Sequence, residues 1–181
     1  MVHLFLAFLF EINIFASEYQ PLQDQDWLTC TSSSFIANYG QTSYSVNYQI
    51  CSKDLDVPSE QEIISTTQKI FSFASSLGFS HVECAPIEKL EIYKISTEML
   101  NDRKRFSKWS NQGLGKIWGL YDPRLDEVGI ASIMLTEHGD WDKITLAHEL
   151  SHYWYDRLCW NKNWSKDDEQ FALDFEKYFS K

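Results

Sequence analysis

Two histidines one helical turn apart are the residues of this chain with the most evident chemistry. The segment from Thr145 to Trp160 reads TLAHELSHYWYDRLCW and places His148, Glu149 and His152 in the order H-E-x-x-H. Residues four apart lie on the same face of an α-helix, so both imidazoles can point a nitrogen at one metal ion. Neutral histidine is a preferred zinc ligand, and a catalytic zinc keeps one position for water. The motif therefore predicts a Zn²⁺ site.

Glu149 directly follows the first histidine, which places it beside the bound water rather than on the metal. Its carboxylate can take a proton from water as the water attacks a carbonyl, and then pass it to the leaving amine. We therefore expect Glu149 to be the general base of a peptide-bond hydrolase. The competing interpretation is an amphipathic helix with two solvated histidines. With five histidines in the chain, the motif would rarely arise by chance. It also falls on an expected helix directly after an expected strand, and both observations favour the metal site.

A third protein ligand is needed, because catalytic zinc sites use three. No histidine follows His152, and the longer metzincin motif is absent, since Tyr155 and Leu158 stand at its glycine and third-ligand positions. Carboxylates remain as candidates, and spacing alone does not choose among Asp156, Asp167, Asp168, Glu169, Asp174 and Glu176.

The run from His148 to Phe179 resembles the gluzincin zinc metallopeptidases, and in particular the aminopeptidase N-like pattern. That family shows HELxHxWF, then a tryptophan-bearing stretch, then E-G-F-A on the next helix. The matching residues are His148, Glu149, Leu150, His152 and Trp154 in the first part, and Glu169, Phe171 and Ala172 in the second, with Gln170 replacing the glycine.

The resemblance implies that Glu169 is the third ligand, donated from the following helix, with Asp168 as the alternative. It also implies a peptide or protein substrate and a zincin-like α+β fold. That fold has a small mixed or antiparallel sheet, an active-site helix and a following ligand-bearing helix. The resemblance is confined to the C-terminal part of the chain, and no G-A-M-E-N-like exopeptidase motif accompanies it.

Other side chains are secondary candidates for the site. Asp156 or Asp174 can orient a ligand histidine, or can simply be solvated. A tyrosine can donate to the oxyanion of the reaction, although packing is the simpler role for each of Tyr153, Tyr155 and Tyr178. His138 can touch substrate or lie exposed. An aromatic cluster is expected to pack the two helices together: Trp154, Trp160, Trp164, Phe171 and Phe175.

The elements that position these residues follow an α+β order. A capping box at Ser59 and Glu62 begins a helix that Gly78 ends. Trp27–Lys53 is rich in Ser, Thr, Tyr and Asn and is interpreted as loops and short strands. The remaining expected elements are a strand at Lys89–Ser96, a short helix at Thr97–Trp109, strands at Lys116–Tyr121 and Val128–Leu135 around a turn at Asp122-Pro123, the motif helix capped by Asp140 or Asp142, and a helix at Lys166–Phe179.

Val128–Leu135 has two interpretations. The resemblance implies a sheet-edge strand beside the metal, lying antiparallel to the substrate, and the small residues Gly129, Ala131 and Ser132 would let another backbone approach. An interior strand is the alternative.

The N-terminal residues suggest a secretory signal. Leu4 to Phe10 is continuously apolar, and small residues follow at Ala16 and Ser17, where cleavage is expected. Glu11 interrupts the run and no Lys or Arg precedes it, so a buried strand or helix is the alternative. The run is too short for a membrane span. We expect residues 1–17 to be a signal peptide and residues 18–181 a single catalytic domain, secreted or periplasmic.

Composition limits the remaining choices. The net charge is −10 and no basic run is present, which argues against nucleic-acid binding. The hydrophobic fraction of 44% argues against a disordered chain. Four cysteines without a C-x-x-C, behind an expected export signal, favour two disulfides over four free thiols. Three pairings are possible, and Cys30–Cys51 with Cys84–Cys159 is preferred because the first would close the N-terminal segment rich in Ser, Asn and Tyr.

The sequence thus predicts a secreted zinc metallopeptidase in which His148, His152 and Glu169 bind the metal and Glu149 is the base. Two alternatives stay open. One is a non-catalytic zincin-like module that binds zinc or a protein, and the other is a disulfide-stabilised extracellular binding domain without metal.

Overall fold

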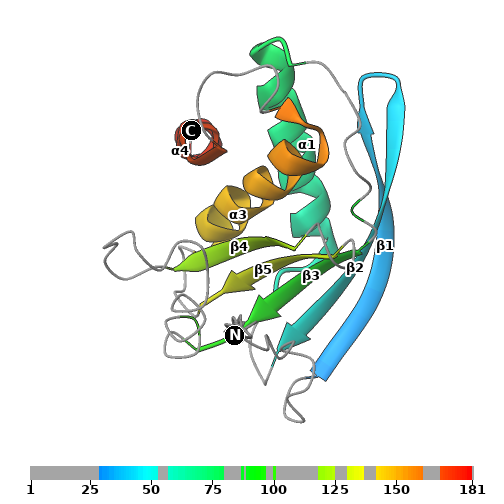
Figure 1. Ribbon diagram of the computed structural model, residues 1–181, viewed down its shortest axis with the longest axis vertical. Helices are drawn as coiled ribbons and strands as arrows, with labels where there is room; N and C mark the ends of the chain where they lie inside the picture. The colour runs from blue at the N-terminus through cyan, green and yellow to red at the C-terminus, as the bar shows by residue number, and fades with distance from the viewer. Residues whose placement is uncertain are drawn as a thin grey trace, which may run out of the picture.

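A five-stranded mixed sheet carries three helices on one face in the part of the chain that the structure describes (Figure 1). The computed structural model describes residues 29–52, 57–79, 87, 89–96, 100, 118–124, 130–136, 142–160 and 168–180. The strand order is β1-β2-β3-β5-β4, with β2, β3 and β5 parallel and both outer strands antiparallel to their neighbours. The expected combination of helices with a small mixed sheet is therefore confirmed.

The first two strands form a long hairpin. β1 (Thr29–Tyr39) pairs with β2 (Thr42–Ser52) through a two-residue turn, and a positive φ at Gly40 but not at Gln41 fits a type II′ turn. The expectation of loops and short strands here was wrong. Tyr44, Val46 and Tyr48 alternate into the core, and Thr and Tyr favour strands even where the composition is polar.

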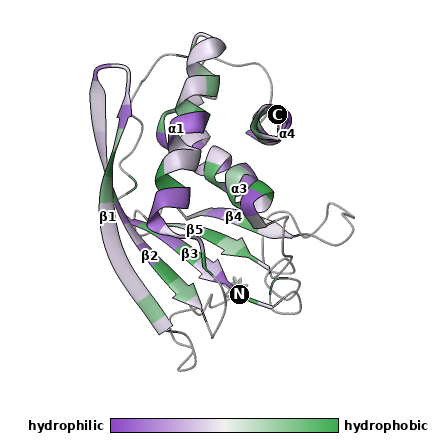
Figure 2. Ribbon diagram, turned by 180° about the vertical axis from the view of Figure 1, so that it is seen from behind, coloured by the Kyte–Doolittle hydropathy of each residue, from purple (hydrophilic) through white to green (hydrophobic). Residues whose placement is uncertain are grey.

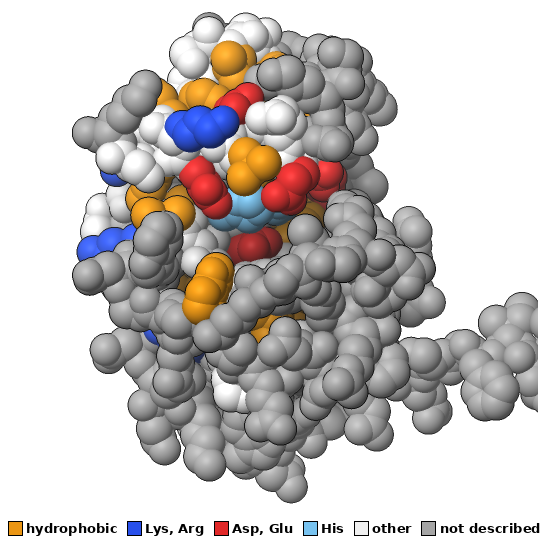
Figure 3. All heavy atoms as spheres, turned by 90° about the vertical axis from the view of Figure 1, so that its left-hand side faces the viewer, with side chains coloured by type: hydrophobic (Ala, Val, Ile, Leu, Met, Phe, Trp, Pro, Cys, Tyr) orange, Lys and Arg blue, Asp and Glu red, His pale blue; other side chains and the backbone are white. Residues whose placement is uncertain are grey.

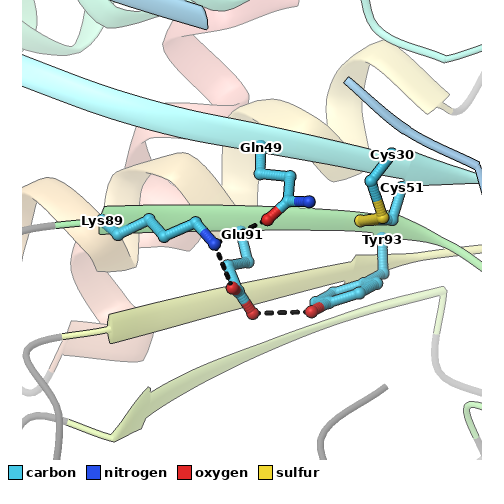
Figure 4. Close-up of a disulfide and its surroundings, with 6 residues drawn as sticks. All are labelled: Cys30, Gln49, Cys51, Lys89, Glu91 and Tyr93. Carbon is cyan, nitrogen blue, oxygen red and sulfur yellow. Dashed lines mark hydrogen bonds and ion pairs between the residues drawn. A yellow bond between two sulfur atoms is a disulfide. The ribbon is translucent and has the colours of Figure 1, made fainter. Parts of the chain in front are cut away.

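One of the two expected disulfides lies across this hairpin. Cys30 and Cys51 are directly opposed in register and are bonded, as Figure 4 shows. Cys159 is also disulfide-bonded, while Cys84 lies outside the described residues. The same face of the sheet carries a buried polar network, in which Lys89 and Tyr93 both donate hydrogen bonds to Glu91.

Helix α1 (Glu60–Ser76) begins and ends as its sequence predicts. Ser59 and Glu62 form the capping box, and Gly78 follows the last turn with a φ of 76°. After β3 (Lys89–Lys94) come β4 (Gly119–Arg124) and β5 (Ile130–Leu135), which pair antiparallel. Asp122-Pro123 is not a turn but part of β4. Proline is tolerated there because β4 is the last strand of the described sheet.

β5 lies inside the sheet, between β3 and β4, and Figure 2 shows it as largely hydrophobic. The interpretation of Val128–Leu135 as an edge strand was therefore wrong and the interior alternative is confirmed; the strand beyond β5, outermost on that side among the described residues, is β4. Gly129 lies outside the described residues, as do the signal segment 1–17, the N-cap candidate Asp140 and nearly all of the expected helix Thr97–Trp109.

Helices α3 (Asp142–Arg157) and α4 (Asp168–Phe179) follow the sheet and pack against each other. Trp154 is fully buried against Phe71 of α1, and its indole nitrogen donates a hydrogen bond to Thr67. Phe171 of α4 is fully buried among aromatic rings from α1 and α3. Four of the five aromatic residues expected to pack these helices are buried, and Trp164 lies outside the described residues. In the part of the chain that the structure describes, no helix is both long and apolar enough to cross a bilayer.

Candidate metal centre

The imidazoles of His148 and His152 face one another on the side of α3 opposite its core-facing residues. Their Nε2 atoms are 3.1 Å apart and their ring centroids 4.8 Å apart. Leu146, Leu150 and Trp154 occupy the core side of the same helix. Figure 3 shows the histidine side chains recessed on this face of the molecule and bordered by acidic side chains.

The first turn of α4 brings Glu169 to the same point. One carboxylate oxygen lies 3.4 Å from His152 Nε2 and the other lies 3.7 Å from His148 Nε2. Atoms held at 2.0–2.1 Å from a tetrahedral ion are roughly 3.3 Å apart. The Nε2–Nε2 separation of 3.1 Å is close to this value, and single donor atoms from the three residues lie within 4.8 Å of one another. The three side chains can therefore share one metal ion once the Glu169 carboxylate turns one of its oxygens toward both rings.

Two further carboxylates approach the opposite nitrogens of the rings. Glu176 Oε1 accepts a hydrogen bond from His148 Nδ1 at 2.7 Å, and Asp168 Oδ2 lies 3.5 Å from His152 Nδ1. Such carboxylates fix the tautomer in which Nε2 presents its lone pair to a metal. Asp168, the alternative third ligand, thus lies on the Nδ1 side of one ring, whereas Glu169 faces the Nε2 atoms of both.

Glu176 was missed as an orienting residue by sequence reasoning, which considered Asp156 and Asp174 for that role or as solvated side chains. Asp174 instead accepts hydrogen bonds from Gln170 and Lys177 on its own helix. The signal for Glu176 was present, since it follows Glu169 by seven residues, two helical turns, and so shares its face.

Glu149 is buried, with 6% of its surface exposed, between α3 and the start of β4. Burial raises the pKa of Glu149, and the neighbouring His148 and His152 only partly offset this. A raised pKa brings a carboxylate closer to the range in which it both accepts and returns a proton. Gly119 of β4 is in immediate contact with this side chain, another neighbour that the sequence did not reveal.

The acidic side chains also change the basicity of the histidines in the metal-free protein. Burial by itself lowers the pKa of His148, but hydrogen bonds with Glu169 and Glu176 outweigh it and raise the value to about 10. Burial is likewise outweighed at His152, where Asp168 and Glu169 raise the pKa to about 9. The two histidines in turn hold the pKa of Glu169 well below its usual range. The acidic side chains therefore stabilise positive charge at the two histidines.

Tyr121 of β4 lies flat against His152, with ring planes 6° apart and centroids 6.0 Å apart. Burial raises the pKa of its hydroxyl well above the usual value, with the Asp156 carboxylate contributing in the same direction. Stacking of this kind limits rotation of the imidazole. Tyr121 was not singled out in the sequence, because nothing in its local pattern shows that β4 lies beside α3.

The tyrosines considered as oxyanion donors have other contacts. The Tyr153 hydroxyl accepts a hydrogen bond from Arg157, and the Tyr155 ring is buried against Trp160 and Phe171. Tyr178 packs on Phe73 and Phe175. His138 lies outside the described residues.

Comparison with known proteins adds no identification of this arrangement. No model of a protein family matches the chain, and no curated protein matches its sequence.

Proposed function

We propose that this chain is a zinc-dependent metallopeptidase with a zincin-like catalytic domain. His148, His152 and Glu169 hold the ion, and Glu149 is the general base and acid. The observation that carries the proposal is the convergence of two Nε2 atoms, 3.1 Å apart, and one carboxylate, with donor atoms of all three residues within 4.8 Å of one another. A second carboxylate, that of Glu149, is buried on the same helix next to these histidines.

A bound zinc would polarise a carbonyl and lower the pKa of a coordinated water to about 7. Glu149 would accept the proton of the attacking water and deliver it to the amide nitrogen as the peptide bond breaks. Glu176 would hold His148 in the tautomer that leaves Nε2 unprotonated, and Asp168, 3.5 Å from His152 Nδ1, would do the same for His152 by moving closer to it. Tyr121 would keep the His152 ring in place.

The substrate would lie along β4. This strand ends the described sheet, packs against α3, and lies beside Glu149 through Gly119 and beside His152 through Tyr121. An outer strand of a sheet can present backbone groups to an extended peptide. We infer an oxidising compartment, secreted or periplasmic, because Cys30–Cys51 and Cys159 are disulfide-bonded.

The test is to measure metal content and peptide hydrolysis for the wild type and for Glu149→Gln. We expect one zinc per chain in both proteins, because Glu149 is not a ligand. We expect the variant to lose roughly 10²–10⁴-fold in kcat, the usual contribution of a general base. Absence of metal from the wild type would overturn the proposal. Zinc without hydrolysis would favour the non-catalytic zinc module.

A further inference from the structure

Gly119 leaves the space in which the Glu149 side chain lies. A Cβ atom built on Gly119 would meet Glu149 Oε1 at 2.5 Å, Thr145 Cγ2 at 2.6 Å and Glu149 Cγ at 2.9 Å. Ordinary contacts of a Cβ atom begin near 3.4 Å, so any other residue type is excluded here unless the helix side chains move. The three atoms that the Cβ would meet first include none from His148, His152 or Glu169.

The requirement at Gly119 concerns space and not backbone conformation. The described glycines with a positive φ are Gly40 and Gly78, and Gly119 is not among them. An L-residue could therefore adopt the backbone of Gly119 without strain. Glycine inside a strand weakens the strand, and a common reason for its presence is that another group approaches the backbone closely. At this position the approaching group is the proposed base.

We propose that Gly119 is a positioning residue for Glu149. By lacking a side chain, it allows the Glu149 carboxylate to lie between β4 and α3 beside the two histidines. A methyl group at this position would displace the carboxylate, and the atoms that it would meet first belong to Glu149 and Thr145 and not to the metal ligands. The inference rests on the proposed function only in assigning a proton transfer to Glu149; the steric relation between the two residues holds independently of it.

The first experiment measures turnover of a quenched fluorescent peptide by the full chain. Gly119→Ala is made in a Thr145→Ser background, which removes the Cγ2 methyl and leaves Glu149 as the clashing residue. We expect zinc content and KM to stay unchanged while kcat falls about 100-fold, the usual effect of displacing a reacting group by about 1 Å. In a Thr145→Ser, Glu149→Gln background, Gly119→Ala should cause no further loss of kcat, because the effects of substitutions in residues that act as a unit are not additive. An equal loss in both backgrounds would contradict the proposal.

The second experiment measures unfolding by denaturant and does not depend on activity. Gly119→Ala should lower the unfolding midpoint in the Thr145→Ser background. It should lower the midpoint much less when that background also carries Glu149→Ala, because this substitution removes the atoms that clash. Gly78→Ala is the matched control. Its cost comes from a positive φ with nothing within 4 Å of the new methyl, and it should be the same in both backgrounds.

The outcomes separate the two proposals. If the effects of substitutions at residues 119 and 149 on the unfolding midpoint are not additive, but no peptide is hydrolysed, the positioning role is supported and the peptidase assignment is overturned. Hydrolysis without coupling would overturn the positioning role alone. A Gly119→Ala protein that folds only when Glu149 is truncated supports the proposal, and one that folds in neither background contradicts it.

Discussion

We expect the carboxylates on the Nδ1 side of the histidine rings to influence how tightly the proposed site binds a metal. Glu176 accepts a short hydrogen bond from His148 Nδ1, and a ligand histidine held in this way is both oriented and more basic. We expect Glu176→Gln to weaken zinc binding about 10–100-fold, as measured by competition with a chelator. Asp174→Asn is the matched control on the same helix, since Asp174 bonds to Gln170 and Lys177. Equal effects of the two substitutions would contradict the assigned role.

Zinc affinity should also depend on pH in a defined way. The His148 and His152 Nε2 atoms are 3.1 Å apart, so only one hydrogen fits between them, and Nδ1 of His148 donates to Glu176. Glu169 raises the pKa of both rings, with Glu176 acting on His148 and Asp168 on His152, so the pair holds its single shared proton at neutral pH. A metal must displace it, so the apparent association constant should rise about tenfold per pH unit from roughly pH 6 to pH 8. Calorimetry over this range measures the slope, and a slope of zero or of two protons would contradict the shared proton.

At the residue scale, much of the site could be predicted from the sequence. His148 and His152 share a helix, so their spacing defines their geometry. Glu169 came from the resemblance, and the structure places it with both histidines. Gly119 and Tyr121 could not be found in the same way, because they reach the site through the packing of a strand on a helix, which local spacing does not encode.

At the scale of elements, the docking of α4 on α3 is what brings Glu169 to the histidines. Phe171 lies two residues after Glu169 and is fully buried against Phe73, Tyr155 and Trp160. We expect Phe171→Ala to lower the free energy of unfolding by about 3–5 kcal/mol, the usual cost of a large cavity. Zinc affinity should fall as well, because α4 would no longer be held in one position.

Leu173→Ala provides the comparison for this prediction. Leu173 lies on the same helix and 39% of its surface is exposed, so its truncation should cost far less stability. Denaturant unfolding and zinc titration of both variants check the expectation. Loss of stability in Phe171→Ala with unchanged zinc affinity would show that α4 docking does not control the site.

Helices were predicted better than strands, for a physical reason. The capping box at Ser59 and the glycine at the end of α1 are local signals, and the helix has the expected bounds. The hairpin β1–β2 was missed because its polar composition was given more weight than its alternation. Asp122-Pro123 was taken for a turn, whereas proline at this sheet edge needs no ladder hydrogen bond. The order of the strands depends on contacts between distant residues.

At the scale of the whole molecule, the disulfide of the hairpin and the proposed metal ligands are located in different regions. Cys30–Cys51 ties β1 to β2, while the proposed ligands all come from α3 and α4. Replacing both cysteines by serine should cost about 3 kcal/mol, the loop-closure estimate for this separation, and lower Tm by about 6–12 °C. Zinc stoichiometry should remain unchanged. A loss of zinc binding measured alongside the thermal shift would mean that the hairpin supports the site.

The most direct test of the metal centre is a calorimetric titration of zinc into the metal-free full-length protein, compared with Glu169→Ala. We expect the wild type to bind one ion per chain, and Glu169→Ala to bind it far more weakly, because only two of three protein donors remain. Failure of the wild type to bind zinc, or equal binding by the two proteins, would contradict the assignment of His148, His152 and Glu169 as one metal site.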